Sequence, residues 1–279
     1  MLPLEDSYTD VIGKAQRGLG LSDDAVAQKA GVSVDALKSL KDGKLDEAVA
    51  SKVASALDLH GPSLIQLAKG AYAPKPIEID GLKQFTTTYG DMTVNSYIIW
   101  DLNSKIAAAF DTGADAKPML DFVKEKGLKL EEIFLTHTHP DHVAAIGELR
   151  TTQNVWLSNK EPRDKPPLAT QMGLAPLQLP NNTPFRIDNL RVLLRSTRGH
   201  SVGGITFVVR GLKHHVAVVG DAIFAGSMGG GIVSYADALA TNRKEIFLLP
   251  DDTIVCPGHG PMTTIGEEKA NNPFYPEFK

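Results

Sequence analysis

Cysteine, net charge and long apolar runs are all scarce in this chain. Its 279 residues contain one cysteine, Cys256, so no intramolecular disulfide can form, as is usual in a reducing compartment. Acidic residues outnumber basic ones, 33 to 29, and such a chain does not attract a polyanion by bulk electrostatics. No apolar run approaches the roughly 18 residues that span a bilayer, and the N-terminus lacks the features of a signal peptide. We therefore expect a cytoplasmic protein without a membrane partner.

What the chain does contain falls into two regimes. Residues 5–70 show helical periodicity with no convincing strand, and serine and glycine stand where helix caps stand. Helices are expected at 7–16, 22–30, 33–40, 46–57 and 63–68, with Ser22, Ser33 and Ser63 as N-caps and Gly31, Gly43 and Gly61 after helix ends. Proline then breaks the pattern at Pro74 and Pro76. We predict a helical domain at 1–72, a linker at 73–80 and a second domain at 81–279.

The second region alternates between strand and helix patterns, which predicts a mixed α and β domain. Strands are expected at 85–89, 96–100, 106–110, 133–136, 155–157, 191–194, 205–209, 216–219 and 253–256. Helices are expected at 117–125, 143–150, 235–248 and 266–270. Six prolines between Pro162 and Pro184 predict that this stretch is mostly loop.

Ligand-type side chains concentrate after the strand at 133–136. His137, His139, Asp141 and His142 lie within six positions, and Pro140 turns the chain between them. Imidazole nitrogen combined with carboxylate oxygen is typical of sites for Zn²⁺ and similar cations. A polar helix cap with exposed histidines is the alternative, but so tight a cluster favours a metal site.

Three more candidates stand near predicted strands downstream: His200 in a Gly-rich turn, Asp221 after an apolar strand, and His259 between two glycines. Each alone is as easily a turn or cap residue. Together they place five of the eight histidines in three short motifs at strand ends. His60, His214 and His215 are interpreted as surface or packing residues, and Cys256 as a core residue.

The order of these motifs resembles the metallo-β-lactamase superfamily. The resemblance covers about residues 80–279 and implies an α+β fold, a four-layer αββα sandwich, here preceded by a small all-α N-terminal domain. It implies a first metal site at His137, His139 and His200 and a second at Asp141, His142 and His259. Asp221 would bridge the two ions, and Asp141 and Asp221 are the catalytic candidates. Zn²⁺ is the expected metal, with Fe or Mn²⁺ as alternatives.

The stretches that begin at Gly220 and Pro257 are similar to the glyoxalase II-like branch, whose members resemble hydroxyacylglutathione hydrolases. In that branch a loop after the bridging aspartate lies close to the substrate. Here the loop includes Ser227, Met228, Gly229 and Gly230 and lacks the basic residue common in the branch. Losing that side chain removes an anchor for a carboxylate, and a neutral turn without a substrate role is the alternative.

The resemblance implies a metallo-hydrolase that acts on a thioester or related ester through a metal-bridged hydroxide. Two alternatives stay open: a persulfide dioxygenase-like iron enzyme, and a transcription regulator with a metal-containing sensor domain. A true β-lactamase is disfavoured because the best-known class carries cysteine at the position of Asp221.

Residues 10–70 are similar to a repressor-like (Xre) helix-turn-helix, on the stretch from Leu21 to Leu40. The helix that would read bases opens Val34-Asp35-Ala36 and offers no Arg, Asn or Gln there. Residues 1–70 carry eight basic and ten acidic side chains. That balance disfavours DNA binding and favours a role in dimerisation or in covering the active site, so a homodimer is left open.

Overall fold

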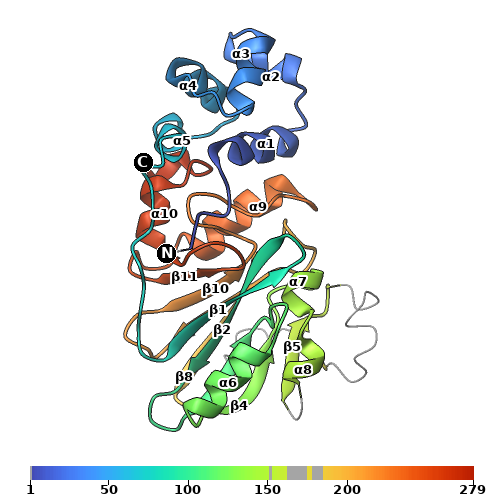
Figure 1. Cartoon of the computed structure of the whole chain (residues 1–279), viewed down its shortest axis with the longest axis vertical. Helices are drawn as coiled ribbons and strands as arrows, with labels where there is room; N and C mark the ends of the chain where they lie inside the picture. The colour runs from blue at the N-terminus through green and yellow to red at the C-terminus, as the bar shows by residue number, and fades with distance from the viewer. Residues whose placement is uncertain (1, 151–152, 162–174, 178–184) are drawn as a thin grey trace.

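Two β-sheets face each other in the computed structural model, which describes residues 2–150, 153–161, 175–177 and 185–279 (Figure 1). The first sheet has the order β1 (Leu82–Tyr89), β2 (Met92–Trp100), β3 (Ile106–Phe110), β4 (Lys129–Phe134), β5 (Asn154–Ser158), β6 (Ala175–Leu177). The second has the order β12 (Thr263–Thr264), β11 (Ile254–Pro257), β10 (Val216–Gly220), β9 (Ile205–Arg210), β8 (Leu190–Ser196), β7 (Phe185–Ile187). Parallel pairing runs from β3 to β6 and joins β10 to β11.

Three apolar clusters separate the layers. Between the sheets, the ring of Phe134 packs against Phe110 and Phe207, each at a centroid distance of 5.2 Å. A second cluster lies between the first sheet and the helices α6 (Lys117–Glu125) and α8 (Ile146–Leu149). The third joins the second sheet to α9 (Tyr235–Thr241) and α10 (Ile265–Asn271). Helix, sheet, sheet and helix thus stack in four layers, which confirms the expected αββα fold.

The N-terminal helices are α1 (Tyr8–Gly18), α2 (Asp23–Ala30), α3 (Val34–Lys41), α4 (Glu47–Ala56) and α5 (Gly61–Ala68). Ser22 and Ser33 cap α2 and α3 as expected, since each hydroxyl accepts a backbone N–H. The expected Ser63 cap is wrong. His60 caps α5 through the Ser63 N–H, and Gly61 begins that helix instead of ending the one before. Pro62 favours this earlier start because the first helical turn needs no N–H from it.

The N-terminal helices share their core with the second sheet. Val11, Leu37 and Leu64 belong to the same buried cluster as Val208 and Ala217 of the sheet. In Figure 1 these helices lie directly above α9 and α10. The fit is close: a Cβ added at Gly18 would overlap the Tyr235 ring, and the His60 N–H donates to the Pro273 carbonyl at 2.8 Å. The helical segment is therefore packed firmly on the rest of the chain.

Two predicted helices are broken in the structure. The helix expected at 143–150 is split into α7 (Pro140–Val143) and α8. The split occurs because the His142 carbonyl accepts from Thr112 N–H and the Ala145 N–H donates to Gly113, which removes both groups from the helical ladder. The helix expected at 235–248 ends as α9 and continues as a π-helix, η2 (Asn242–Ile246). Asn242 is buried and donates to Ala222 and Tyr275, and such polar insertions accompany π-bulges.

The loop expected between Pro162 and Pro184 lies mostly outside the described residues. Its described part is the short strand β6, which had not been expected. Because β6 is the edge of its sheet, Pro176 fits there without removing a ladder bond from an inner strand.

Among the described residues, no helix is both long and apolar enough to cross a bilayer.

The buried carboxylate of Glu268, on α10, holds Tyr72, the residue just before the linker. Glu268 accepts hydrogen bonds from the Tyr72 hydroxyl at 2.8 Å, the Gly226 N–H at 3.0 Å and the Asn272 amide at 2.8 Å. Burial raises the pKa of Glu268 from 4.5 to about 7, although the hydrogen bonds from Asn272 and Tyr72 oppose the rise. Between these two pH values, Glu268 is therefore protonated to a greater extent in the folded state than in the unfolded state.

We expect this group to make stability depend on pH. The contribution of Glu268 to the free energy of unfolding is full below pH 4.5 and is lost as the pH rises to about 7. Relative to Glu268→Gln, the wild-type protein should lose about 3 kcal/mol across this window. Urea unfolding at a series of pH values measures the difference, with the exposed Glu125→Gln as control. Parallel profiles for wild type and Glu268→Gln would contradict the assignment.

Candidate metal centre

The end of β4 delivers the first group of ligand-type side chains. His137 and His139 project from the segment between β4 and α7, and their ring centroids lie 4.5 Å apart. Pro140 begins α7, and this short helix turns Asp141 and His142 toward the same point. His142 is fully buried, and its ring lies 4.2 Å from that of His137. The turn at Pro140 thus joins two histidines from an extended segment to two residues from a helix.

The second sheet delivers the remaining three. His200 lies between β8 and β9, Asp221 follows β10, and His259 follows β11. Close approach depends on glycine at Gly258, where an added Cβ would overlap Asp221 Oδ1 and lie 2.5 Å from His142 Cε1. Only a residue without a side chain leaves room for the two ligands at that position.

The seven predicted ligands meet at one place and form two groups. The first contains His137, His139, His200 and Asp221, and the second contains Asp141, His142 and His259; within each group the ligand atoms lie within 4.8 Å of one another. Asp221 faces both groups: its Oδ1 is 3.2 Å from His142 Nε2 and its Oδ2 is 3.2 Å from His200 Nε2. This position between the groups is the one expected of a bridging carboxylate.

The donor set fits metal ions. His137 Nε2, His142 Nε2 and Asp221 Oδ1 are buried atoms without a hydrogen-bond partner, and such atoms are costly unless something binds them. The other ring nitrogens are already engaged: Nδ1 of His142 with Asp111, Nδ1 of His200 with the Gly230 carbonyl, and Nδ1 of His259 with the Thr93 carbonyl. Engagement of one nitrogen while the other faces the centre is typical of metal-binding histidine.

The charges of the cluster also suit a cation. Burial would raise the pKa of Asp221, but His142 and His200 outweigh it and hold this pKa well below its ordinary value. Burial lowers the pKa of His137 well below its ordinary value, and the neighbouring His142 adds to the effect. An ionised carboxylate and a neutral imidazole are the forms that bind metal. His142 and His259, whose pKa values the neighbouring carboxylates raise against the effect of burial, would therefore release their protons when a metal binds.

Asp111 supports the site and was missed by sequence reasoning. Its carboxylate accepts from the Thr136 N–H at 2.7 Å, the Thr136 hydroxyl at 2.8 Å and His142 Nδ1 at 2.8 Å. It follows β3 with a φ of 55°, a conformation that a non-glycine residue adopts rarely. The signal was available, because Asp111 ends an apolar strand just as Asp221 does.

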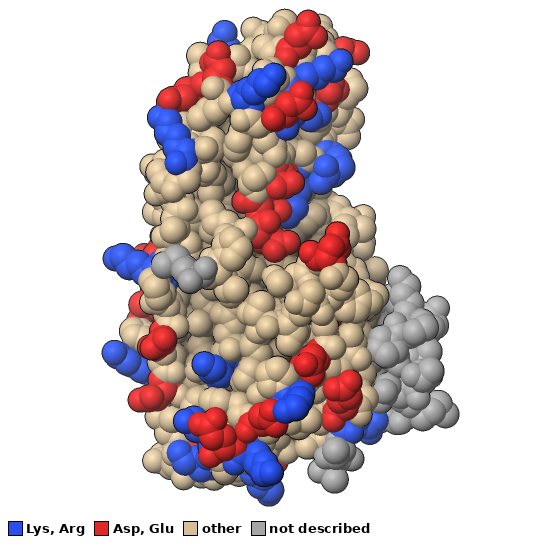
Figure 2. All heavy atoms as spheres, viewed as in Figure 1, with Lys and Arg blue, Asp and Glu red and all other residues tan. Residues whose placement is uncertain are grey.

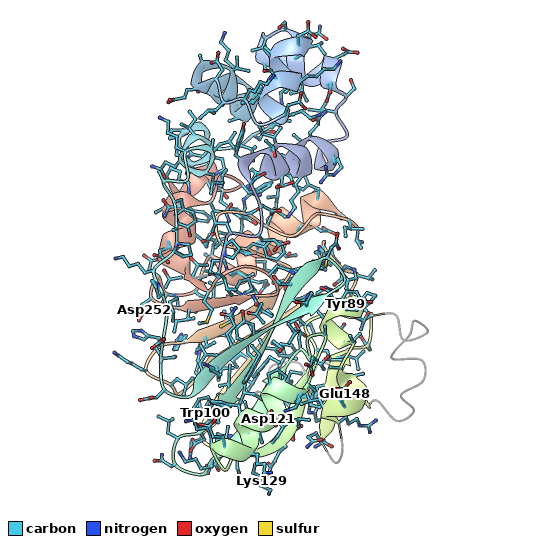
Figure 3. All side chains as sticks on the ribbon, viewed as in Figure 1. Tyr89, Trp100, Asp121, Lys129, Glu148 and Asp252 are labelled. Carbon is cyan, nitrogen blue, oxygen red and sulfur yellow. The ribbon has the colours of Figure 1, made fainter. Side chains whose placement is uncertain are left out.

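We expect Asp111→Asn to weaken metal binding about 10- to 100-fold. Asparagine has one acceptor oxygen, so it cannot accept both from the Thr136 N–H and from His142 Nδ1, which use different oxygens of Asp111. If the amide oxygen keeps the Thr136 N–H, the His142 ring loses the bond that fixes its tautomer. Chelator competition measures the affinity. Asp121→Asn is the control, since Asp121 lies on the exposed face of α6 (Figure 3) and pairs with Lys117 there. Equal affinities in the two variants would contradict this role.

Glu161 is a second supporting residue that the sequence did not reveal. It is buried and accepts from the Thr138 N–H at 3.1 Å, the Thr138 hydroxyl at 2.8 Å and the Gly203 N–H at 2.6 Å. Thr138 lies between two ligand-type histidines, and Gly203 follows His200. The carboxylate therefore joins the histidine loops of the two sheets, although its local sequence indicates only a polar loop.

The expected substrate loop lies against the centre but is largely covered. Ser227 and Met228 are each only 1% exposed. A Cβ at Gly229 would lie 3.0 Å from His200 Nδ1, and the Gly230 carbonyl pairs with that same ring. The loop thus holds His200 in place; its contact with a substrate stays a prediction.

Two residues that the sequence analysis placed outside the metal site, His214 and Cys256, lie where it expected them. His214 lies at the surface and pairs with Asp252 at 3.0 Å, away from the centre. Cys256 is fully buried in β11, as expected of a core residue, and burial raises the pKa of its thiol. A thiol held protonated in this way is a poor nucleophile, so the chemistry of the site belongs to the His/Asp cluster.

Comparison with known proteins agrees with this geometry. The family model described as "Metallo-beta-lactamase superfamily" matches residues 89–259. Hydroxyacylglutathione hydrolase GloC of Haemophilus influenzae is 32% identical over 197 residues, which cover 64% of this chain and 92% of the relative.

Two solved structures share the fold. The BLEG-1 B3 metallo-β-lactamase is 29% identical with a TM-score of 0.56, covering 69% of this chain and 98% of that one. TTHA1623 in a di-iron-bound form is 27% identical with a TM-score of 0.55, covering 68% of this chain and 99% of that one. The relatives therefore include a thioester hydrolase by name, a β-lactamase by name and a protein that holds two irons.

Proposed function

Because the chain belongs to the metallo-β-lactamase superfamily, we propose that it is a metal-dependent hydrolase of a thioester of the hydroxyacylglutathione type or a related ester. The observation that carries the proposal is the convergence of seven ligand-type side chains with Asp221 between the two groups. The named hydroxyacylglutathione hydrolase among the relatives supports the thioester. We propose two divalent ions, with Zn²⁺ first and Fe or Mn²⁺ as alternatives; the di-iron relative supports a pair.

The seven candidate ligands are proposed to have different roles in hydrolysis. When bound, divalent ions supply a Lewis acid for a carbonyl oxygen and lower the pKa of water toward about 7. His137, His139 and His200 would hold one ion, Asp141, His142 and His259 the other, and Asp221 both. Asp141 keeps its proton off because its bond to His259 outweighs the effect of burial and lowers its pKa. A carboxylate that holds an ion through one oxygen keeps the other able to accept a hydrogen from water and orient it.

A substrate panel on metal-analysed protein tests the proposal. We expect release of free thiol from S-D-lactoylglutathione or another thioester, without oxygen consumption. Oxygen uptake with a persulfide substrate would instead show the dioxygenase alternative. Turnover of a β-lactam without any thioester would place the chain with its β-lactamase relative. Either result would overturn the thioester proposal.

We propose that the N-terminal helices serve the active site and do not read DNA. Basic and acidic side chains are interspersed over the visible face of these helices (Figure 2), whereas a DNA-binding surface gathers basic ones. In this proposal, α2 and α3 keep the fold of a helix-turn-helix but not its DNA-binding role. A gel shift at physiological salt with the chain's own promoter region is the test, and a sequence-specific shift would contradict it.

A further inference from the structure

The first residues of the chain lie beside the metal centre. A Cβ added at Gly260, which directly follows the ligand-type His259, would lie 3.1 Å from the Glu5 nitrogen and 3.5 Å from Glu5 Cβ. The Pro3 carbonyl is 3.6 Å from the same point. The segment Pro3–Asp6 therefore covers the turn that carries His259, and Glu5 is its residue nearest to that turn.

This segment is anchored on both sides of Glu5. On one side it rests on Gly260. On the other, Asp6 Oδ2 accepts from the Ser227 hydroxyl at 2.6 Å and forms an ion pair with Lys14. Lys14 also donates to the Met228 carbonyl at 2.9 Å and lies 4.9 Å from the centroid of the Phe224 ring. These contacts hold the chain start on the loop that borders the metal centre.

The ion pair between Lys14 and Asp6 is largely shielded from solvent, and its two charges offset each other. The side chains of Lys14 and Asp6 are 14% and 9% exposed, so the positive charge of Lys14 is already matched by Asp6. Glu5, by contrast, is exposed, and its carboxylate forms no ion pair among the described residues. Its negative charge is therefore available to a molecule that approaches the centre.

We propose that Glu5 is a specificity-determining residue that recognises a positively charged group on the leaving part of the substrate. The inference rests on the proposed hydrolase function and deepens it by naming a substrate class: a thioester or ester whose thiol or alcohol carries an ammonium. A carboxylate attracts an ammonium group by direct charge, so Glu5, exposed and without an ion pair among the described residues, suits a cationic substrate.

The electrostatic surroundings of Glu5 agree with its place at the centre. Partial shielding of the Glu5 carboxyl from solvent raises its pKa, although the residue as a whole is exposed, and His259 opposes the rise. The charge of Glu5 is thus within electrostatic reach of this ligand-type residue. The loop lacks a basic side chain of its own from Ser227 to Gly231, and the Lys14 ammonium that contacts it is paired with Asp6.

The test compares two substrates of the same shape. Acetylthiocholine carries a quaternary ammonium, and S-(3,3-dimethylbutyl) thioacetate replaces its nitrogen with carbon. At pH 8 and low salt we expect kcat/KM to favour the cationic thioester about fivefold, the size of one exposed charge pair. The preference should vanish in Glu5→Gln, reverse in Glu5→Lys and shrink with added salt. Glu125→Gln, on α6 at the opposite outer layer, should keep the wild-type preference.

Binding of the thioether analogues, in which a methylene replaces the carbonyl, separates recognition from hydrolysis. Calorimetry should show the same charge preference in the wild type and its loss in Glu5→Gln. A preference in binding without turnover of either thioester would support Glu5 recognition and overturn the hydrolase proposal. Turnover of both thioesters with no preference, or with one that Glu5→Gln and Glu5→Lys leave unchanged, would overturn the role of Glu5.

Discussion

Replacing Asp221 with alanine is expected to remove bound metal and hydrolysis together. Its two carboxylate oxygens lie 3.2 Å from His142 Nε2 and 3.2 Å from His200 Nε2, so the variant leaves both ligand groups without their shared member. Activity should fall by at least about 10³-fold, because a water activated by metal is about eight pKa units more acidic than free water. Metal analysis and thioester hydrolysis on the same preparation measure the two losses.

Asp252→Ala provides the matched control. Asp252 is also an aspartate near a strand of the second sheet, but its exposed side chain pairs with His214, and Figure 3 shows it at the edge of the molecule. We expect this variant to keep its metal and its activity. Full activity in Asp221→Ala, or loss of activity with metal fully retained, would refute the bridging role.

Substituting Gly258 with alanine should damage the centre without removing a single ligand. The added methyl would overlap Asp221 Oδ1 and lie 2.5 Å from His142 Cε1, so one of the two must move. Displacement of a reacting group by about 1 Å can cost about 10²-fold in rate, and we expect a loss of that size in kcat/KM. The affinity for metal should fall in parallel, as chelator competition would reveal.

Gly61→Ala tests whether any such methyl would have the same effect. Gly61 begins α5, and a Cβ there meets Ser51 Oγ at 3.4 Å and Ala54 at 3.9 Å, which is ordinary packing. This variant should hydrolyse substrate and bind metal as the wild type does. If Gly258→Ala did so too, the tight packing of the ligands around Gly258 would be wrong.

The meeting of the seven candidate ligands could be anticipated because of where they stand in the sequence. Asp221 and His259 follow two parallel neighbouring strands, β10 and β11, and the ends of such strands meet at one edge of a sheet. In the first sheet His137 likewise follows β4, which is parallel to its neighbours β3 and β5. Strand patterns and ligand-type residues together therefore pointed to this edge.

The partners of the supporting residues could not be anticipated, even where the residue itself stood out as Asp111 did, because those partners lie in distant parts of the chain. Asp111 and His142 are 31 positions apart, and Asp6 and Ser227 are 221 apart. A local pattern carries no information about such pairs. Distance in sequence also explains the π-helix at the end of α9, because buried Asn242 contacts Ala222 and Tyr275, 20 and 33 positions away. The α5 cap was misplaced for a local reason, since serine is a preferred N-cap residue and Ser63 lies only three positions from the true cap, His60.

The proposed hydrolase function requires that the cluster hold a pair of cations. Calorimetric titration of metal-free protein with Zn²⁺ measures this directly. We expect two bound ions per chain, one for each ligand group, with both sites weakened in Asp221→Ala because they share that carboxylate. Zinc binding no stronger than that of a His137→Ala, His142→Ala double variant would contradict the account.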